Sequence, residues 1–98
     1  MSDVSFYYLN TIYGMQKFPV PSHLDLDDTG MVCWMHLLYS VKEWDKLLKD
    51  TSPTRATVKA RDKLDFKNNI LGNVLARTYG MAATYYILEA RRMQDHWK

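Results

Sequence analysis

Four small residues recur at every fourth position within the most apolar stretch of the chain: Gly72, Ala76, Gly80 and Thr84. Residues four apart lie on the same side of an α-helix, so this spacing predicts a ridge of small side chains. A glycine inside a helix costs about 1 kcal/mol relative to alanine, and two on one face indicate packing that a larger side chain would block. The ridge therefore predicts a helix-packing or oligomer interface, with Tyr79 and Met81 as its flanking residues.

Composition and charge describe an ordinary globular chain. Apolar residues make up 47% of the 98 residues and charged residues 24%, a balance typical of a folded protein and unlike that of a disordered tail. This length predicts one domain over residues 1–98, with a modest core and no large cleft between layers. A net charge of +2 predicts neither a strong field that attracts nucleic acid nor the acidic surface of a DNA mimic.

Cysteine usage and the amino terminus bear on the cellular compartment. Cys33 is the only cysteine, so no internal disulfide can form and the chain needs no oxidising compartment. Residues 1–4 lack the basic segment and apolar core of a secretory signal, and we expect the chain to begin as it was translated. These features predict a cytoplasmic protein.

Apolar residues at spacings of three and four predict two helices before residue 51. The first covers about residues 3–16, and its apolar side comprises Val4, Phe6, Leu9, Ile12 and Tyr13. Pro19 and Pro21 then force an extended connector. The second covers about residues 30–50, and its apolar side comprises Trp34, Leu37, Leu38, Val41, Trp44 and Leu48. No alternating strand pattern is long enough to outweigh this helical periodicity.

The rest of the chain predicts one or two further helices. Ser52 is a good helix cap, and Pro53 suits the first helical position, where its missing N–H is harmless. Only Gly72 and Gly80 weaken the pattern from there to His96. We expect helices over about residues 53–71 and 73–96, or one long helix with a kink. The predicted fold class is all-α, a small bundle of three to four helices.

The segment from Ile70 to Leu88 has nearly the length of a membrane span and contains one charged residue, Arg77. Arg77 lies near the centre of the segment, where a charge costs about 2.5–3.5 kcal/mol on insertion scales. Asn73 and Thr78 add polarity. This composition predicts that the segment does not enter a membrane.

The residue patterns that suggest metal binding or catalysis are incomplete. Residues 25–30 resemble the start of an EF-hand calcium loop, but His36 stands where such a loop needs a bidentate glutamate. An acidic helix amino terminus is the preferred interpretation of this segment. Cys33 and His36 supply too few ligands for zinc, and a nucleophilic pair would need an orienting acid. We therefore expect no metal, no cofactor and no catalytic residues.

Two further sets of residues suggest binding. Candidate phosphate-contacting residues recur every four positions: Arg55, Lys59, Lys63 and Lys67. Acidic neighbours interrupt them, and an ordinary solvated helix face is the preferred interpretation. Candidate partner-binding aromatic residues are Tyr7, Tyr8, Tyr85 and Tyr86. Residues 75–81 resemble the turn of a helix-turn-helix, but the helix after them has too apolar a face to read bases.

One leading hypothesis and one alternative follow. The first is a non-enzymatic protein-binding module that acts through helix–helix contacts and self-association, such as a small accessory or inhibitory factor of the kind that phages encode. It predicts a protein partner, a homo-oligomer and no membrane contact. The alternative is a nucleic-acid or nucleotide binder that uses the basic residues and exposed tyrosines.

Overall fold

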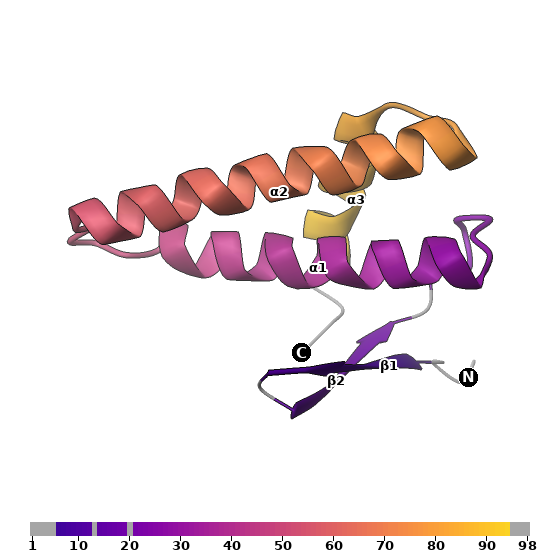
Figure 1. Ribbon diagram of the computed structural model, residues 1–98, viewed down its shortest axis with the longest axis horizontal. Helices are drawn as coiled ribbons and strands as arrows, with labels where there is room; N and C mark the ends of the chain where they lie inside the picture. Colours follow the sequence, from indigo (N-terminus) through magenta and orange to yellow (C-terminus); the bar gives the residue numbers. More distant parts are fainter. Residues whose placement is uncertain (1–5, 13, 20, 95–98) are drawn as a thin grey trace.

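A two-stranded hairpin followed by three packed helices forms the part of the chain that the computed structural model describes, residues 6–12, 14–19 and 21–94 (Figure 1). The elements are β1 (Phe6–Thr11), β2 (Gly14–Pro19), α1 (Asp28–Leu48), α2 (Arg55–Tyr79) and α3 (Ala83–Gln94). Helices α1 and α2 lie side by side in opposite directions, α3 passes behind them, and the hairpin packs on the side of α1 away from α2. The prediction of a mostly helical fold is confirmed.

The predicted first helix over residues 3–16 is wrong where the structure describes it. Strands β1 and β2 pair antiparallel there, with Tyr7 opposite Phe18 and Leu9 opposite Gln16. Aromatic and β-branched residues favour strands, and this preference prevailed over an apolar spacing that also fits a helix. The extended connector predicted around Pro19 is confirmed in part, because its first residues form β2. Residues 3–5 lie outside the described residues, as do residues 95 and 96 of the predicted last helix.

The tight connection between the strands depends on Gly14. Gly14 has a φ of +94°, a left-handed conformation that glycine adopts without the steric cost of a side chain. Beside it, the Thr11 hydroxyl donates a hydrogen bond of 2.9 Å to the Gly14 carbonyl. With the turn closed in this register, Phe18 is fully buried and Leu9 packs against the core.

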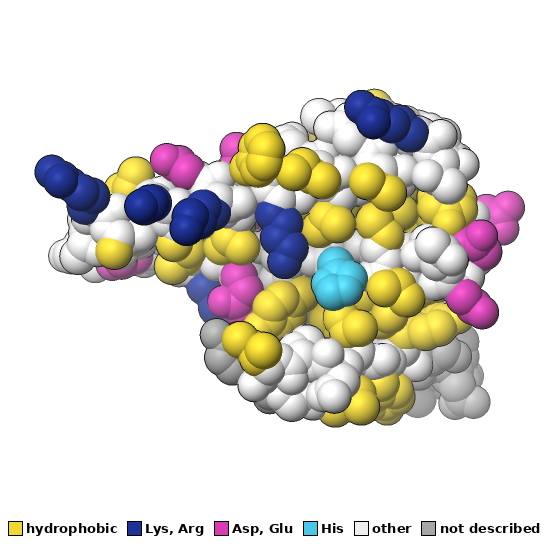
Figure 2. All heavy atoms as spheres, in the orientation of Figure 1, with side chains coloured by type: hydrophobic (Ala, Val, Ile, Leu, Met, Phe, Trp, Pro, Cys, Tyr) yellow, Lys and Arg dark blue, Asp and Glu magenta, His cyan; other side chains and the backbone are white. Residues whose placement is uncertain are grey.

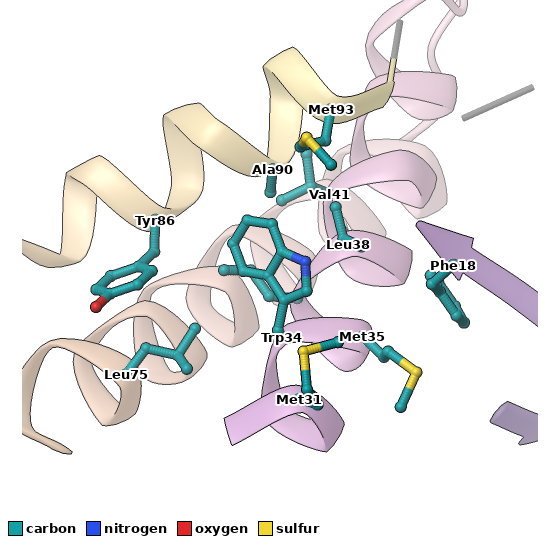
Figure 3. Close-up of a cluster of buried hydrophobic side chains, with 11 residues drawn as sticks. Phe18, Met31, Trp34, Met35, Leu38, Val41, Leu75, Tyr86, Ala90 and Met93 are labelled. Atoms are coloured by element: carbon teal, nitrogen blue, oxygen red, sulfur yellow. The ribbon is translucent and has the colours of Figure 1, made fainter. Parts of the chain in front are cut away.

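The hydrophobic core surrounds Trp34, whose side chain lies among residues of α1, α2 and α3 (Figure 3). Trp34, Leu37, Leu38 and Val41 are fully buried, as the sequence predicts. Figure 3 shows the Trp34 ring between Leu75 of α2 and Ala90 of α3. The last two residues predicted for this side differ: Trp44 is half-buried and Leu48 is exposed, because the carboxyl-terminal end of α1 extends beyond the core.

Asp27 joins the start of α1 to the end of α2. Its carboxylate accepts a hydrogen bond of 2.8 Å from the Gly30 backbone N–H, which satisfies one of the free donors of the first helical turn. The Tyr79 hydroxyl donates to the same carboxylate oxygen. Gly30 leaves room for that ring, since a Cβ atom there would lie 2.6 Å from it. The acidic segment therefore serves as a helix cap, as predicted.

The predicted break in the carboxyl-terminal helical region occurs at Gly80, and the boundary near Gly72 is wrong. Helix α2 runs through Gly72 and ends at Tyr79, and Gly80 caps it with a φ of +89°. The next residue, Met81, also has a positive φ, of 67°. Two consecutive left-handed residues cannot continue a right-handed helix. At the other end, Thr54 caps α2, not Ser52: its hydroxyl accepts from the Thr57 N–H at 3.2 Å.

The joined ends of α1 and α2 form a two-helix arm without a core of its own. No residue from Lys42 to Asp65 is buried, whereas the buried residues of α2 begin at Asn68. Figure 1 shows this arm projecting beyond the part of α1 that the hairpin and α3 cover. The side chains of the arm are exposed or half-buried, and Trp44 at its base lies under the Arg91 guanidinium of α3.

A polar cluster around Glu89 links α3 to the segment between β2 and α1. The Glu89 carboxylate lies 2.7 Å from His23 Nε2 and accepts hydrogen bonds of 2.9 and 2.8 Å from Arg92. The Arg92 guanidinium and then His23 lower the pKa of Glu89 to about 2. The folded state therefore favours the ionised carboxylate.

Replacing Glu89 with glutamine is expected to reduce the loss of stability in acid. Because the folded pKa lies below the unfolded one, the ionised form stabilises the protein above about pH 4.5, and this contribution is lost as the pH falls towards 2. Between pH 6 and pH 3 the wild type should lose about 1 kcal/mol more unfolding free energy than Glu89→Gln, since solvent screens the partly exposed partners. Urea unfolding at both pH values measures this difference.

A Glu43→Gln variant controls for the change in net charge, because Glu43 makes one surface ion pair, 3.3 Å from Lys46. It should follow the wild-type pH dependence. Parallel curves for the wild type and Glu89→Gln would show that the cluster contributes no acid-sensitive stability.

Candidate interaction surface

None of the described elements covers the side of the α1/α2 pair opposite the side on which α3 packs (Figure 1). We call this side, together with the exposed surface of α2 beside it, the open face. On α2 it presents a row of exposed apolar side chains, with Phe66 69% exposed, Ile70 47% and Val74 46%. These residues follow one another at intervals of four, so they lie along one side of the helix. The inner side of α2 already packs on the core through Leu75, so the exposed row is a second apolar surface.

Exposed cations extend this apolar row in both directions. Lys63 and Lys67 stand three residues before Phe66 and Ile70, and Arg77 stands three after Val74, so all lie beside the row. Lys59 and Arg55 continue towards the arm, and the four predicted phosphate-contacting residues are all exposed.

None of those four cations takes part in an ion pair within the described part of the chain. The four-residue spacing of Arg61 and Asp65 also predicts an ion pair, and none is formed between them within the described residues. Helix α2 contains six Lys and Arg residues and two Asp residues, so it carries an excess of positive charge.

Figure 2 shows the two kinds of side chain on this side of the molecule. Lys and Arg side chains lie over the amino-terminal half of α2, and hydrophobic side chains lie over its middle and along the seam with α1. The exposed side chains of the open face combine charge and apolar character along one helix pair. They are Val32 and His36 on α1, and Arg55, Lys59, Lys63, Phe66, Lys67, Ile70, Val74 and Arg77 on α2.

Helix α1 joins the open face through His36 and its neighbours. Partial burial and then the positive charge of Lys67 lower the pKa of His36, which keeps the imidazole neutral near pH 7. One turn away, the Cys33 sulfur lies 3.8 Å from the Leu71 carbonyl oxygen, and burial raises the pKa of its thiol. Cys33 therefore lacks the depressed pKa of an activated nucleophile.

The ridge of small residues is divided between two helices and a turn. Gly72 is buried against α3, where a Cβ would lie 3.0 Å from the Ala83 carbonyl oxygen and 3.3 Å from Ile87. Ala76, which also lies on α2, is half-buried. A Cβ at Gly80, in contrast, would have no neighbour within 4 Å. The close approach of two backbones therefore exists within the chain, at Gly72.

The other residues of the predicted interface also lie in different parts of the structure. Thr84 is exposed on α3, and Met81 is exposed in the turn. Tyr79 is half-buried and is held by its contact with Asp27. The break at Gly80 changes the chain direction, so the four-residue spacing does not place these residues on one surface.

The four candidate aromatic residues lie in two places. Tyr8 is 64% exposed and Tyr7 is at the margin of exposure, so the hairpin does present tyrosine to solvent. Tyr86 is buried, and its hydroxyl donates a hydrogen bond of 2.7 Å to the Gly80 carbonyl. Tyr85 is half-buried and meets Tyr86 edge-on, with ring centroids 5.5 Å apart. Tyr86 therefore holds the turn, with Tyr85 packed against it, and the two do not form a freely exposed aromatic pair.

Sequence reasoning missed Phe66, Ile70 and Val74 as site residues. Their spacing of four is visible in the sequence, but it lies within a helix that also has an inner apolar side. Only the placement of α1 and α3 shows which side of α2 is covered. The sequence signal that could have identified them is a second row of apolar residues at helical spacing, beside the row of Lys and Arg residues.

Comparison with known proteins gives no relative for this chain: no family model, no curated protein and no solved structure matches it. Within the described residues, no group of three or more histidine, cysteine, aspartate or glutamate side chains is placed to hold a metal ion. None of the helices in the described ranges combines the length and apolar character needed to cross a bilayer.

Proposed function

We propose that this protein is a non-enzymatic protein-binding module, and that the open face is where it binds its partner. The observation that carries the proposal is the exposed apolar row of Phe66, Ile70 and Val74 on a helix whose inner side is already packed. Apolar anchors at helical spacing are the pattern by which helices dock on partner proteins. Its lone cysteine makes the cytoplasm the proposed location.

The energetic argument rests on the area that a partner would cover. Burying the side chain of a large apolar residue contributes about 1.5–3 kcal/mol. Phe66, the most exposed of the three, is also the residue type that is enriched at the centre of interfaces. Three such side chains in a row can supply the few strong contacts on which most interfaces depend. An accessory or inhibitory role would need no more than such a surface.

Nucleic-acid binding is a second candidate, favoured by the unpaired cations from Arg55 to Lys67. Phosphate contacts by such a row would weaken steeply as salt rises. Ile70 and Val74 count against it, since aliphatic side chains neither stack on bases nor pair with phosphates. The partner is therefore better described as a protein.

Site-specific cross-linking tests the proposal. With a photoreactive phenylalanine analogue at position 66, irradiation of cells that naturally contain the protein should yield a discrete protein adduct. The double variant Phe66→Asp, Ile70→Asp should co-purify at least about tenfold less of the cross-linked partner protein, because two apolar side chains are lost from the interface. Quantitative mass spectrometry measures both results.

Leu88 is the matched control because it is a similarly exposed apolar residue, 60% exposed, on α3. The cross-linker at position 88 should give no such adduct, and Leu88→Asp should leave co-purification unchanged. Equal adduct yields at positions 66 and 88, or no protein adduct at position 66, would refute the proposal.

A further inference from the structure

We infer that the partner of the open face is an acidic amphipathic helix that packs along the seam between α1 and α2. This inference rests on the proposed function and names the chemistry of the partner. Three observations support it. One side of the helix pair is open, the cations beside the apolar row have no ion-pair partner in the described residues, and these cations are spaced along α2 on both sides of Ile70.

The open side of the helix pair suits a third helix. Two antiparallel helices form a shallow seam, and helices pack by fitting their side chains into such grooves. His36 of α1 and Lys67 of α2 are both exposed beside this seam. The two helices are in contact there, because the Cys33 sulfur lies 3.8 Å from the Leu71 carbonyl oxygen. Helix α3 already packs against both α1 and α2 on the other side, so a helix on the open face would complete a sandwich.

Charge indicates that the partner helix is acidic. Lys59, Lys63 and Lys67 have no ion-pair partner in the described residues, and Arg77 has none at the far end of the row. Covering Ile70 with an apolar surface would bring those cations into a region that contains less water. Aspartate or glutamate residues on both flanks of the partner's apolar side would neutralise them and speed association.

The same charges argue against a second copy of this chain as the occupant. In a two-fold antiparallel packing centred on Ile70, Lys63 of one copy would face Arg77 of the other. In a parallel packing, Lys63 would face Lys63. Like charges placed opposite each other at an interface are unfavourable. The open face is therefore suited to a different, acidic chain.

A yeast-displayed library of 18-residue helical peptides tests the charge preference directly. Each peptide carries leucine or isoleucine at spacings of three and four, and its flanking positions vary among glutamate, lysine, glutamine and serine. The full-length protein is the target, and the Phe66→Asp, Ile70→Asp variant removes peptides that bind elsewhere. Peptides dependent on the open face should carry at least about fivefold more glutamate than lysine at the flanks.

Charge reversal provides the control. A Lys59→Glu, Lys63→Glu, Lys67→Glu variant should bind the best acidic peptide at least about tenfold more weakly and should select lysine at the same flanks. Equal glutamate and lysine frequencies on the wild type, or an unchanged preference on the variant, would overturn the inference and leave the proposed function standing. If no peptide of the library binds through the open face, both the inference and the proposed function are overturned.

Two other classes of occupant are outcomes of the same test. Binding of a 20-nucleotide single-stranded DNA, and of a phosphatidylcholine vesicle containing phosphatidylserine, is compared with that of the best peptide at physiological salt. Tighter binding of either one, lost in the charge-reversed variant, would overturn the inference in favour of that class. Weaker binding of both supports a protein helix.

Discussion

Replacing Trp34 with alanine is expected to destabilise the protein by about 3–5 kcal/mol, the largest effect of any substitution considered. Trp34 is the largest fully buried side chain, and it contacts the core from its centre. Its removal leaves a cavity among α1, α2 and α3 that rigid neighbours cannot fill. Guanidinium unfolding followed by circular dichroism should show a correspondingly lower midpoint.

A Trp34→Phe variant separates the effect of the cavity from the effect of removing the indole N–H. Within the described residues the indole N–H of Trp34 has no hydrogen-bond partner, so its removal relieves an unsatisfied donor. Phenylalanine keeps most of the ring volume, and the net cost should be about 1 kcal/mol. If phenylalanine proved as costly as alanine, loss of core volume would not be the explanation.

Replacing Gly72 with leucine is expected to destabilise the protein by about 2–3 kcal/mol. Its Cβ would already lie 3.0 Å from a backbone oxygen of α3, and the rest of the side chain would have to push α3 away from α2. The higher helix propensity of leucine offsets only about 1 kcal/mol of this cost. Equilibrium unfolding measures the change, and weaker packing of α3 should also increase hydrogen exchange near Ala90.

Val74→Leu is the matched control, since Val74 lies in the same helix but is exposed. It should change the unfolding free energy by no more than about 0.5 kcal/mol. Gly80→Leu should also destabilise the protein, by about 1–3 kcal/mol, but through its positive φ and not through packing. Equal stability of Gly72→Leu and Val74→Leu would contradict the close α2/α3 contact.

The two long helices could be predicted because their signals are local. In α1, apolar residues from Trp34 to Val41 follow one period, and the core contacts of this stretch agree with that period. In α2 and α3, Gly80 stops the helix through its own backbone conformation. The local sequence could not decide whether the helix breaks at Gly72 or at Gly80, because a helix can contain a glycine where a neighbouring element packs closely against it.

The hairpin and the open face could not be predicted in the same way. The apolar spacing of residues 6–12 favours a helix, and their residue types together with the pairing with β2 decided for a strand. The four candidate phosphate-contacting residues are exposed along α2, and their phosphate contacts stay a prediction; the apolar row beside them was overlooked. Which of two apolar sides of α2 is buried depends on where α1 and α3 lie.

The sequence by itself determined a mostly helical chain, the acidic cap of α1, the break at Gly80 as one of two candidates, and the residues from Trp34 to Val41 that form the core. These follow from side-chain periodicity and backbone preference within a few turns. Only the tertiary structure decided that Gly72 meets α3 and that Phe66, Ile70 and Val74 are left exposed. Burial is a property of neighbours that are distant in sequence, and no local pattern specifies how many sides of a helix those neighbours cover.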